Sequence, residues 1–139
     1  IDKYVQEISL DGVQVYQTKI SNLKHLKLKI QAISVRSQED ILQHLSLLAP
    51  NQYLLCDTFS KTQIGGTGHS FNWQYLPEDC SKIMIAGGIT NEHLPSLFKL
   101  NPYGIDINSR FEKSPGIKDV EKVTDFFKEF ESFSKLSKV

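Results

Sequence analysis

The sequence has few cysteines, no long hydrophobic run and no leader segment. Its two cysteines, Cys56 and Cys80, lack the spacing of metal ligands and are too few for a disulfide framework, so we expect reduced thiols. No apolar run approaches the roughly 20 residues that a membrane-spanning helix needs. No charged-then-apolar leader with a cleavage site opens the sequence. These absences argue against secreted and membrane proteins, and we expect a cytoplasmic protein.

The sequence also lacks an excess of charge of either sign. Sixteen basic and sixteen acidic residues cancel, which removes the usual electrostatic case for binding nucleic acid or an anionic membrane. None of the four histidines is paired with another ligand at metal-binding spacing, so we expect no metal site. With 40% hydrophobic and 23% charged residues, the chain is expected to form a single domain over residues 1–139.

What the sequence does have is a repeated succession of short apolar strands and amphipathic helices. Strands are expected at residues 11–16, 30–35, 53–55, 82–88 and 103–108. Helices are expected between Ser37 and Pro50, from Asn72 over a short stretch, and within residues 89–100. A last helix is predicted from apolar residues at three-to-four spacing, namely Ile117, Val120, Val123, Phe126, Phe127 and Phe130. Strands that alternate with crossover helices predict an α/β fold with a parallel sheet.

Two architectures fit five such strands. One is a complete, doubly wound flavodoxin-like module, which should carry its phosphate loop after the first strand. Here QTKISN follows that strand and contains no glycine, whereas the glycines cluster after the third and fourth strands. An eight-stranded (β/α) TIM barrel with its phosphate site after its last two strands gives that distribution. Because the chain also opens at Ile1 without methionine, we predict a partial barrel covering about strands 4–8, with the N-terminal βα units missing.

Asp57 and a glycine loop form the first candidate site. Asp57 follows the apolar run of the third strand, at the end where parallel α/β proteins carry their chemistry. The loop that follows contains Gly65, Gly66, Thr67 and Gly68, and we expect it to act as a mobile cover. Strand alternation turns Cys56 to the opposite face, so we do not expect it to be catalytic.

The turns after the last two strands form the second candidate site. Gly87 and Gly88 end the fourth strand, and Ser109 and Arg110 follow the fifth. Free N–H groups at such turns bind anions, and a phosphate monoester is the natural guest. Asp106 alternates with isoleucines along the fifth strand and should point to the same end as Asp57, which would allow two carboxylates to divide acid and ligand-orienting roles. The alternative is that the glycines only relieve crowding and the aspartates cap loops.

These motifs, in this order, resemble the phosphoribosylanthranilate isomerase family of tryptophan biosynthesis. The similarity runs over nearly the whole chain, through DGVQVY, IQAISV, LLCDT, GGTGHSFNW, IAGGIT and YGIDINSRFEKSPGIKD. The resemblance implies an Amadori rearrangement of N-(5-phosphoribosyl)anthranilate to 1-(2-carboxyphenylamino)-1-deoxyribulose 5-phosphate, without a metal or organic cofactor. It also implies that Asp57 is the general acid, that Gly88 and the Ser109-Arg110 turn hold the phosphate, and that Asp106 contacts the rest of the substrate.

The sequence departs from the family at several positions. Tyr16-Gln17 stand where members usually have His-Gly, Asn72 stands where many have Asp, and Arg110 stands where many have Gly. The family's cysteine base and its arginine for the anthranilate carboxylate have no match in the sequence. We therefore expect the full-length parent to be active and this chain alone to be inactive, unless a missing segment or a partner chain completes the barrel. A non-catalytic, phosphosugar-binding partial barrel remains the alternative, besides the flavodoxin-like module.

Overall fold

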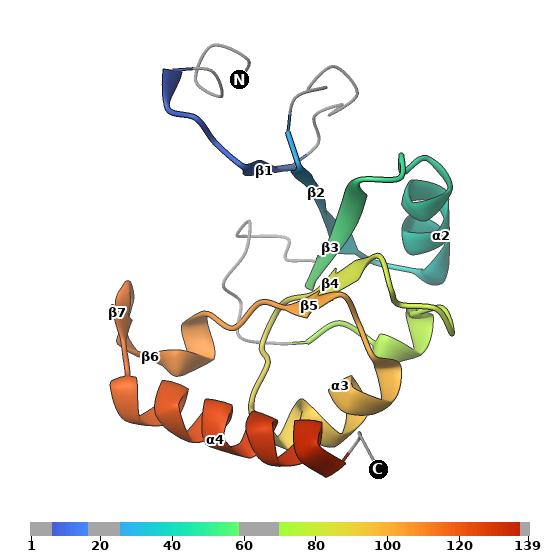
Figure 1. The fold of residues 1–139 in the computed structure, drawn as a ribbon. Helices are drawn as coiled ribbons and strands as arrows, with labels where there is room; N and C mark the ends of the chain where they lie inside the picture. The colour runs from blue at the N-terminus through green and yellow to red at the C-terminus, as the bar shows by residue number, and fades with distance from the viewer. Residues whose placement is uncertain (1–6, 17–25, 59–69, 137–139) are drawn as a thin grey trace.

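The computed structural model describes residues 7–16, 26–58 and 70–136 of the chain. Within them lies one five-stranded sheet in the order β1-β2-β3-β4-β5, in which every neighbouring pair is parallel (Figure 1). The strands are β1 (Gly12–Tyr16), β2 (Leu28–Val35), β3 (Gln52–Thr58), β4 (Ile83–Ile85) and β5 (Gly104–Ile105). All five expected strands are confirmed, although β2 and β3 are longer and β4 and β5 are shorter than expected.

A helix or a 3-10 turn follows each of β2, β3, β4 and β5. They are α2 (Gln38–Ser46), the 3-10 turns η1 (Trp73–Tyr75) and η2 (Asn91–His93), α3 (Leu94–Leu100), the 3-10 turn η3 (Ser109–Phe111) and α4 (Val120–Leu136). The N-caps expected at Ser37 and Asn72 are both present, since their side chains accept hydrogen bonds from the Asp40 and Gln74 N–H groups.

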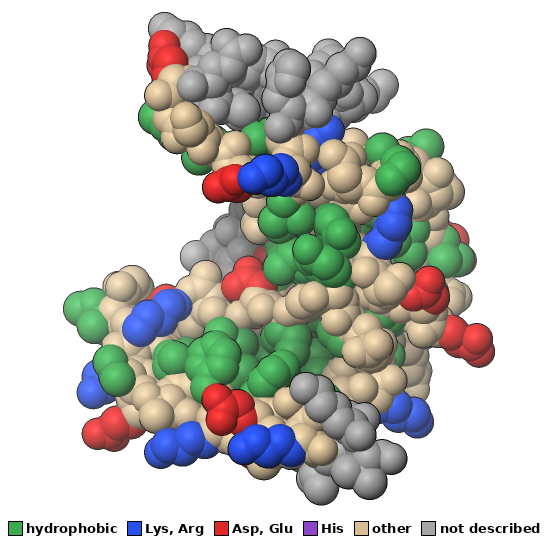
Figure 2. Space-filling view, in the orientation of Figure 1, with side chains coloured by type: hydrophobic (Ala, Val, Ile, Leu, Met, Phe, Trp, Pro, Cys, Tyr) green, Lys and Arg blue, Asp and Glu red, His purple; other side chains and the backbone are tan. Residues whose placement is uncertain are grey.

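The described helices cover one face of the sheet. Sheet residues of that face, such as Val35, Cys56 and Ile85, share one core with Ile41 of α2, Leu97 of α3 and Phe126 of α4. The opposite face, which we call the inner face, carries a separate apolar cluster from β2, β3 and the residue after β4, consisting of Ile30, Ala32, Leu55 and Ala86. Hydrophobic side chains gather over the middle of the molecule in Figure 2.

The strand order decides between the two predicted architectures. A flavodoxin-like domain places β1 inside the sheet, in the order 2-1-3-4-5, with helices on both faces. Here the strands follow one another in sequence and the described helices lie on one face, as in a barrel that winds in one direction. The flavodoxin-like alternative is therefore wrong. The sheet does not confirm the further assignment of these strands to barrel positions 4–8.

The last helix begins later than the sequence suggested. Ile117 lies in a small antiparallel hairpin made of β6 (Glu112–Ser114) and β7 (Ile117–Lys118), and it is 61% exposed. Gly116 adopts a positive φ of 80° in the hairpin turn, which favours the hairpin over an extra helical turn. Val120 and Phe127, which the spacing predicted to face the core, are also exposed. Phe126, next to Phe127, is buried instead.

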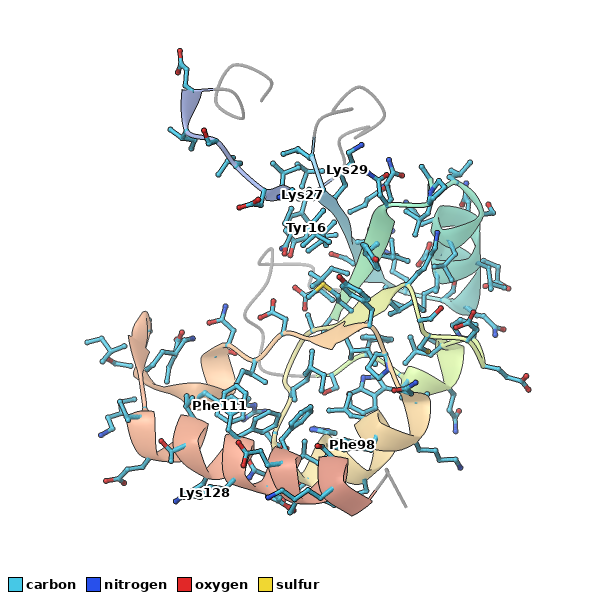
Figure 3. The ribbon with its side chains drawn as sticks, in the orientation of Figure 1. Tyr16, Lys27, Lys29, Phe98, Phe111 and Lys128 are labelled. Atoms are coloured by element: carbon cyan, nitrogen blue, oxygen red, sulfur yellow. The ribbon has the colours of Figure 1, made fainter. Side chains whose placement is uncertain are left out.

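An aromatic cluster fixes α4 to the rest of the domain. Phe111 meets Phe126 edge to face with ring centroids 5.1 Å apart, and Phe98 of α3 lies 4.9 Å from Phe130. Figure 3 shows Phe98 and Phe111 between the sheet and α4. Burying each such side chain contributes roughly 1.5–3 kcal/mol. The cluster thus anchors η3, which follows β5 and carries part of the site described below.

No helix in the described part of the chain is long and apolar enough to cross a membrane.

Candidate functional site

A cavity of about 160 Å³ lies at the carboxyl ends of the parallel strands, and we call it the strand-end pocket. Six of its lining residues are those that the sequence predicted, namely Asp57, Gly87, Gly88, Asp106, Ser109 and Arg110. They come from three successive strand ends of one sheet, which is why residues up to 53 positions apart in the chain meet in one place. The four predicted loop residues Gly65, Gly66, Thr67 and Gly68 lie outside the described residues.

Asp57 is buried, with 8% of its surface exposed, and both of its carboxylate oxygens accept hydrogen bonds. The Thr58 N–H donates to Oδ1 at 2.7 Å, and the Tyr16 hydroxyl donates to Oδ2 at 3.5 Å. A buried carboxylate needs such donors, because an unpaired charge in a low-dielectric setting is costly. Asp57 therefore has a donor on each carboxylate oxygen, one from its own strand β3 and one from β1.

Cys56 points the other way, as the alternation of β3 predicts. Its side chain is fully buried among the apolar residues on the helix-covered face. Burial there raises the pKa of its thiol from 9.0 to about 12, with a smaller contribution from Cys80. A thiol with this pKa carries almost no thiolate at neutral pH, so Cys56 is unsuited to act as a base or nucleophile.

Gly87 approaches Asp57 more closely than any other residue type could. Its φ is +85°, and a Cβ at this position would lie 2.3 Å from Thr58 Oγ1 and 2.9 Å from Asp57 Oδ1. Gly88 follows with a φ of +64°, and the Ser70 hydroxyl donates to the Gly87 carbonyl at 3.0 Å. Both glycines line the strand-end pocket, where backbone without side chains allows a ligand to approach closely.

Asp106 is the second carboxylate of the strand-end pocket. Burial and the nearby charge of Asp57 raise its pKa, while Lys118 acts in the opposite direction. Its backbone N–H donates to the Ile85 carbonyl at 2.9 Å and so continues the β4–β5 ladder beyond β5. The raised pKa means that Asp106 holds its proton more tightly than an isolated aspartate does.

Ser109 and Arg110 begin η3 rather than an α-helix. A single 3-10 turn has little dipole, so the positive charge of this corner comes mainly from side chains. Arg110 lines the strand-end pocket, and Lys118 of β7 donates to Asn108 and, at 2.7 Å, to Glu112. The β6–β7 hairpin, which sequence reasoning missed, thus supports the residues that follow β5.

Sequence reasoning also missed three polar residues of the strand-end pocket. Gln14 and Tyr16 line it from β1, and Asn108 lines it from the segment after β5. Alternation along β1 places Gln14 and Tyr16 on one face, so that signal was present in DGVQVY. Tyr16 was noted only as a departure from a family pattern, and its contact with Asp57 depends on a side-chain conformation that no sequence pattern gives.

Among the residues that the structure describes, no three histidine, cysteine or acidic side chains come together as a metal site. The fold and the pocket instead define a class: a βα protein wound in one direction, with a polar pocket at the strand ends where barrel enzymes place their active sites. The family model described as N-(5'phosphoribosyl)anthranilate (PRA) isomerase matches residues 1–129. The chain belongs to this family.

Curated relatives carry the same family name. An N-(5'-phosphoribosyl)anthranilate isomerase of Leptospira interrogans is 33% identical over 136 residues, covering 96% of this chain and 64% of the relative. Another, of Rippkaea orientalis, is 33% identical over 145 residues, covering 96% of this chain and 67% of the relative. The chain therefore spans about two thirds of the length of the curated relatives that it matches.

Solved structures support the fold. The phosphoribosyl anthranilate isomerase of Thermus thermophilus superposes with a TM-score of 0.72 at 23% identity, covering 94% of this chain and 66% of that one. The isomerase of Thermotoga maritima gives a TM-score of 0.70 at 22% identity, again covering 94% and 66%. At these identities the likeness is one of fold.

Proposed function

We propose that the whole protein containing this chain is a phosphoribosylanthranilate isomerase that acts in tryptophan biosynthesis. The observation that carries the proposal is the strand-end pocket, which combines two carboxylates, a glycine pair with positive φ and an arginine in a chain of this family. The reaction is an internal redox isomerisation, so it needs proton transfers and no external oxidant or reductant. Acid and base side chains are sufficient for such a reaction.

In this proposal Asp57 is the general acid. It protonates the ribose ring oxygen, the ring C1–O bond breaks, and the amine nitrogen forms a Schiff base with C1. Loss of the C2 proton to a base then gives the enol form, which tautomerises to the ketose. The burial of Asp57 at the strand ends and the hydrogen bond from the Thr58 N–H to its Oδ1 support this role, because they place one carboxyl group inside the strand-end pocket.

The phosphate of the substrate would bind at the other side of the same pocket. Gly87 and Gly88 offer backbone that a ligand can approach closely, Ser109 offers a hydroxyl and a backbone N–H, and Arg110 supplies positive charge. Asp106 would face the ribose or anthranilate part, where its carboxylate can accept hydrogen bonds from hydroxyl groups. The glycine loop Gly65-Gly66-Thr67-Gly68 would close over the Schiff base and exclude water.

The catalytic base and the barrel's remaining strands are part of the same proposal. The described residues of the strand-end pocket include no thiol. We propose that β1–β5 are five consecutive strands of an eight-stranded barrel, about strands 4–8, and that further βα units from the same polypeptide or from a partner chain supply the base. The unpaired edges of β1 and β5 within the described sheet support this, because exposed parallel edges are normally covered. The chain by itself should then be inactive.

A small phosphorylated sugar derivative, rather than nucleic acid or a membrane, is the proposed ligand. The balanced charge of 16 basic and 16 acidic residues supports this, as does the small volume of the pocket. The reduced state of Cys56 and Cys80 is consistent with a cytoplasmic enzyme.

The test is turnover by the whole natural protein and by its Asp57→Asn variant, with the two sugar phosphates separated by chromatography. We expect the variant to lose roughly 10²- to 10⁴-fold in kcat. It should still bind a phosphosugar analogue, because the proposed phosphate contacts come from the loops after β4 and β5. Near-normal turnover by Asp57→Asn would remove Asp57 as the general acid.

The pocket's lack of a thiol among its described residues also favours a second candidate, a phosphosugar-binding protein without turnover. That candidate predicts phosphosugar binding by the natural protein, no product, and binding that Asp57→Asn leaves unchanged. A native mass near 15.8 kDa would favour it, whereas a mass larger by roughly three βα units would favour the isomerase.

A further inference from the structure

The Tyr16 hydroxyl has no role in the reaction proposed above, although it reaches the proposed acid. Tyr16 is the last residue of β1, and its Oη lies 3.5 Å from Asp57 Oδ2. Figure 3 shows its side chain extending from the end of β1 toward the middle of the molecule. Tyr16 keeps 37% of its surface exposed, so the contact is not imposed by close packing around the ring.

The register of the sheet explains how a residue of β1 reaches β3. Tyr16 pairs with Ala32 of β2, and Asp57 pairs with Ser34, two residues further along the same strand. Neighbouring strands lie about 4.8 Å apart, so β1 and β3 are separated by roughly 10 Å. Ala32 has a small side chain on the inner face, which leaves room for the Tyr16 ring to cross β2 toward Asp57.

We propose that Tyr16 is a positioning residue, which donates a hydrogen bond to Oδ2 of Asp57 while the Thr58 N–H holds Oδ1, so that the carboxyl group keeps one orientation toward the substrate. The inference rests on the proposed function, because it assigns Tyr16 to the same acid. A distance of 3.5 Å is long for a hydrogen bond. Such contacts are often long without substrate and shorten in the substrate complex.

A phenol suits this task over a wide pH range. Among the residues that the structure describes, the charged side chains that line the pocket around Tyr16 are Asp57 on β3, Asp106 after β5 and Arg110 on η3, and Lys118 of β7 acts on Asp106. Burial, the charge of Asp57 and its hydrogen bond, and the charge of Asp106 all raise the pKa of Tyr16 above its ordinary value. Tyr16 therefore keeps its proton and remains a donor throughout the neutral range, whereas an imidazole in the same place would titrate there.

The first experiment measures kcat and KM of the whole natural protein and of three variants between pH 5.5 and 9. Tyr16→Phe removes the hydroxyl, and we expect kcat to fall about tenfold at every pH with KM changed less than about threefold. Tyr16→His should restore part of kcat on one side of a new titration near the imidazole pKa. The matched control is Tyr53→Phe, because Tyr53 lies on the same face of β3, four residues before Asp57, and does not line the strand-end pocket.

The second experiment is independent of turnover, so it separates this inference from the proposed function. Tyrosine labelled with ¹³C in the ring reports the titration of each phenol by NMR. We expect Asp57→Asn to lower the pKa of Tyr16, and to lower it more than Asp106→Asn does, since Asp57 has the larger influence. A tyrosine without a contact to Asp57 would not respond in this order, so this experiment tests the contact, and the kcat of Tyr16→Phe tests its role.

Each outcome decides the inference. A fall in kcat for Tyr16→Phe together with the Tyr16 response to Asp57→Asn supports it. Unchanged kcat in Tyr16→Phe, or a loss confined to KM, overturns the positioning role. A Tyr16 pKa that does not respond to Asp57→Asn overturns the contact itself. If the natural protein shows no isomerase turnover but Tyr16 still responds to Asp57, then the proposed function has failed and the contact stands without a role in this reaction.

Discussion

At the scale of single residues, Gly87 shows how the backbone and the proposed acid depend on each other. We expect Gly87→Ala to destabilise the protein in two ways, since alanine is strained at a φ of +85° and its Cβ would collide with the side chains of Thr58 and Asp57. The backbone strain alone costs about 1–2 kcal/mol, and the collision adds roughly 1–3 kcal/mol. Urea unfolding of the whole natural protein and of its Gly87→Ala variant measures the sum, as the difference between their free energies of unfolding.

Gly116→Ala is the matched control for that prediction. Gly116 has a φ of +80°, and a Cβ added there would meet no atom within 4 Å. Gly116→Ala should therefore lose only the stability that the backbone strain costs, and it should keep normal turnover. Gly87→Ala should lose turnover as well, because its Cβ would displace Asp57. Equal losses of stability in the two variants would mean that the close approach to Asp57 has no energetic weight.

Asp106 is a residue of the strand-end pocket that we expect to lower the free energy of unfolding when it is ionised. Burial and the charge of Asp57 raise its pKa above 3.8, so the folded state binds its proton more tightly than the unfolded state does. Ionised Asp106 therefore costs stability at neutral pH, and this cost disappears as the pH falls below 3.8. We expect Asp106→Asn to be more stable than the natural protein at pH 7, with the difference shrinking toward pH 3.5 in unfolding experiments.

Asp79 is the control for Asp106, because its pKa is shifted in the opposite direction. Hydrogen bonds from Ser81 lower the pKa of Asp79, so Asp79→Asn should bring no gain in stability at pH 7. If both variants gained equally, the gain would reflect a change in net charge rather than the surroundings of Asp106.

At the scale of elements, the start of α2 is held by a reciprocal pair of hydrogen bonds. The Asp40 N–H donates to Ser37 Oγ at 3.4 Å, and Asp40 Oδ2 accepts from the Ser37 N–H at 3.1 Å. We expect Ser37→Ala to lower the free energy of unfolding by about 1 kcal/mol. Ser46→Ala, at the exposed end of the same helix, should change it by less than about 0.5 kcal/mol. Similar losses in both would show that the cap contributes nothing specific.

The elements were predictable where one local signal dominated. Ser37 and Asn72 are N-caps in the structure because a short polar side chain satisfies the first free N–H groups of a helix, and this needs no tertiary contact. The same local reasoning failed at Ile117, whose helical spacing was overridden by the hairpin around Gly116. It failed at Phe127, which is 52% exposed while its neighbour Phe126 is buried, because helical spacing does not say which residues at the margin of an apolar face tertiary packing covers.

The candidate site was predictable for a related reason. Asp57, Gly87 and Asp106 stand at the ends of consecutive parallel strands, so fold geometry alone brings them together. To predict the contact between Tyr16 and Asp57, one would need the register of β1 against β2 and the side-chain conformation of Tyr16. The β6–β7 hairpin could not be predicted either, because it pairs two short segments that carry no alternating pattern. Contacts set by topology could therefore be predicted, whereas contacts set by side-chain conformation could not.

At the scale of the whole molecule, the inner face and the edge of β5 leave apolar surface exposed. Tyr103, just before β5, is 48% exposed and stacks on Tyr53 with ring centroids 3.8 Å apart. Such surfaces at unpaired edges promote association. We expect the 139-residue chain on its own to self-associate with increasing concentration, and Tyr103→Lys to reduce this association, as measured by sedimentation velocity.

Ile117→Lys is the control for this prediction. Ile117 is more exposed than Tyr103, at 61%, but it lies on the β6–β7 hairpin and not at the edge of β5. It should leave the association nearly unchanged. An equal effect of both lysines would point to general solubility, and a chain that stays monomeric would contradict the exposed edge as an association site.

The order of the strands has a consequence for how the chain acquires its structure during synthesis. Each strand from β2 to β5 pairs with the strand made immediately before it, and with no strand made much later. A ribosome-bound chain therefore always has the partner of its newest strand already available. Domains generally fold from the N-terminal side as they emerge, and here each βα unit can add to the preceding one without waiting for a distant segment. The strand-end pocket would then be assembled in the order Tyr16, Asp57, Gly87, Asp106 and Arg110, and its described lining would be complete only when Arg110 has left the ribosome.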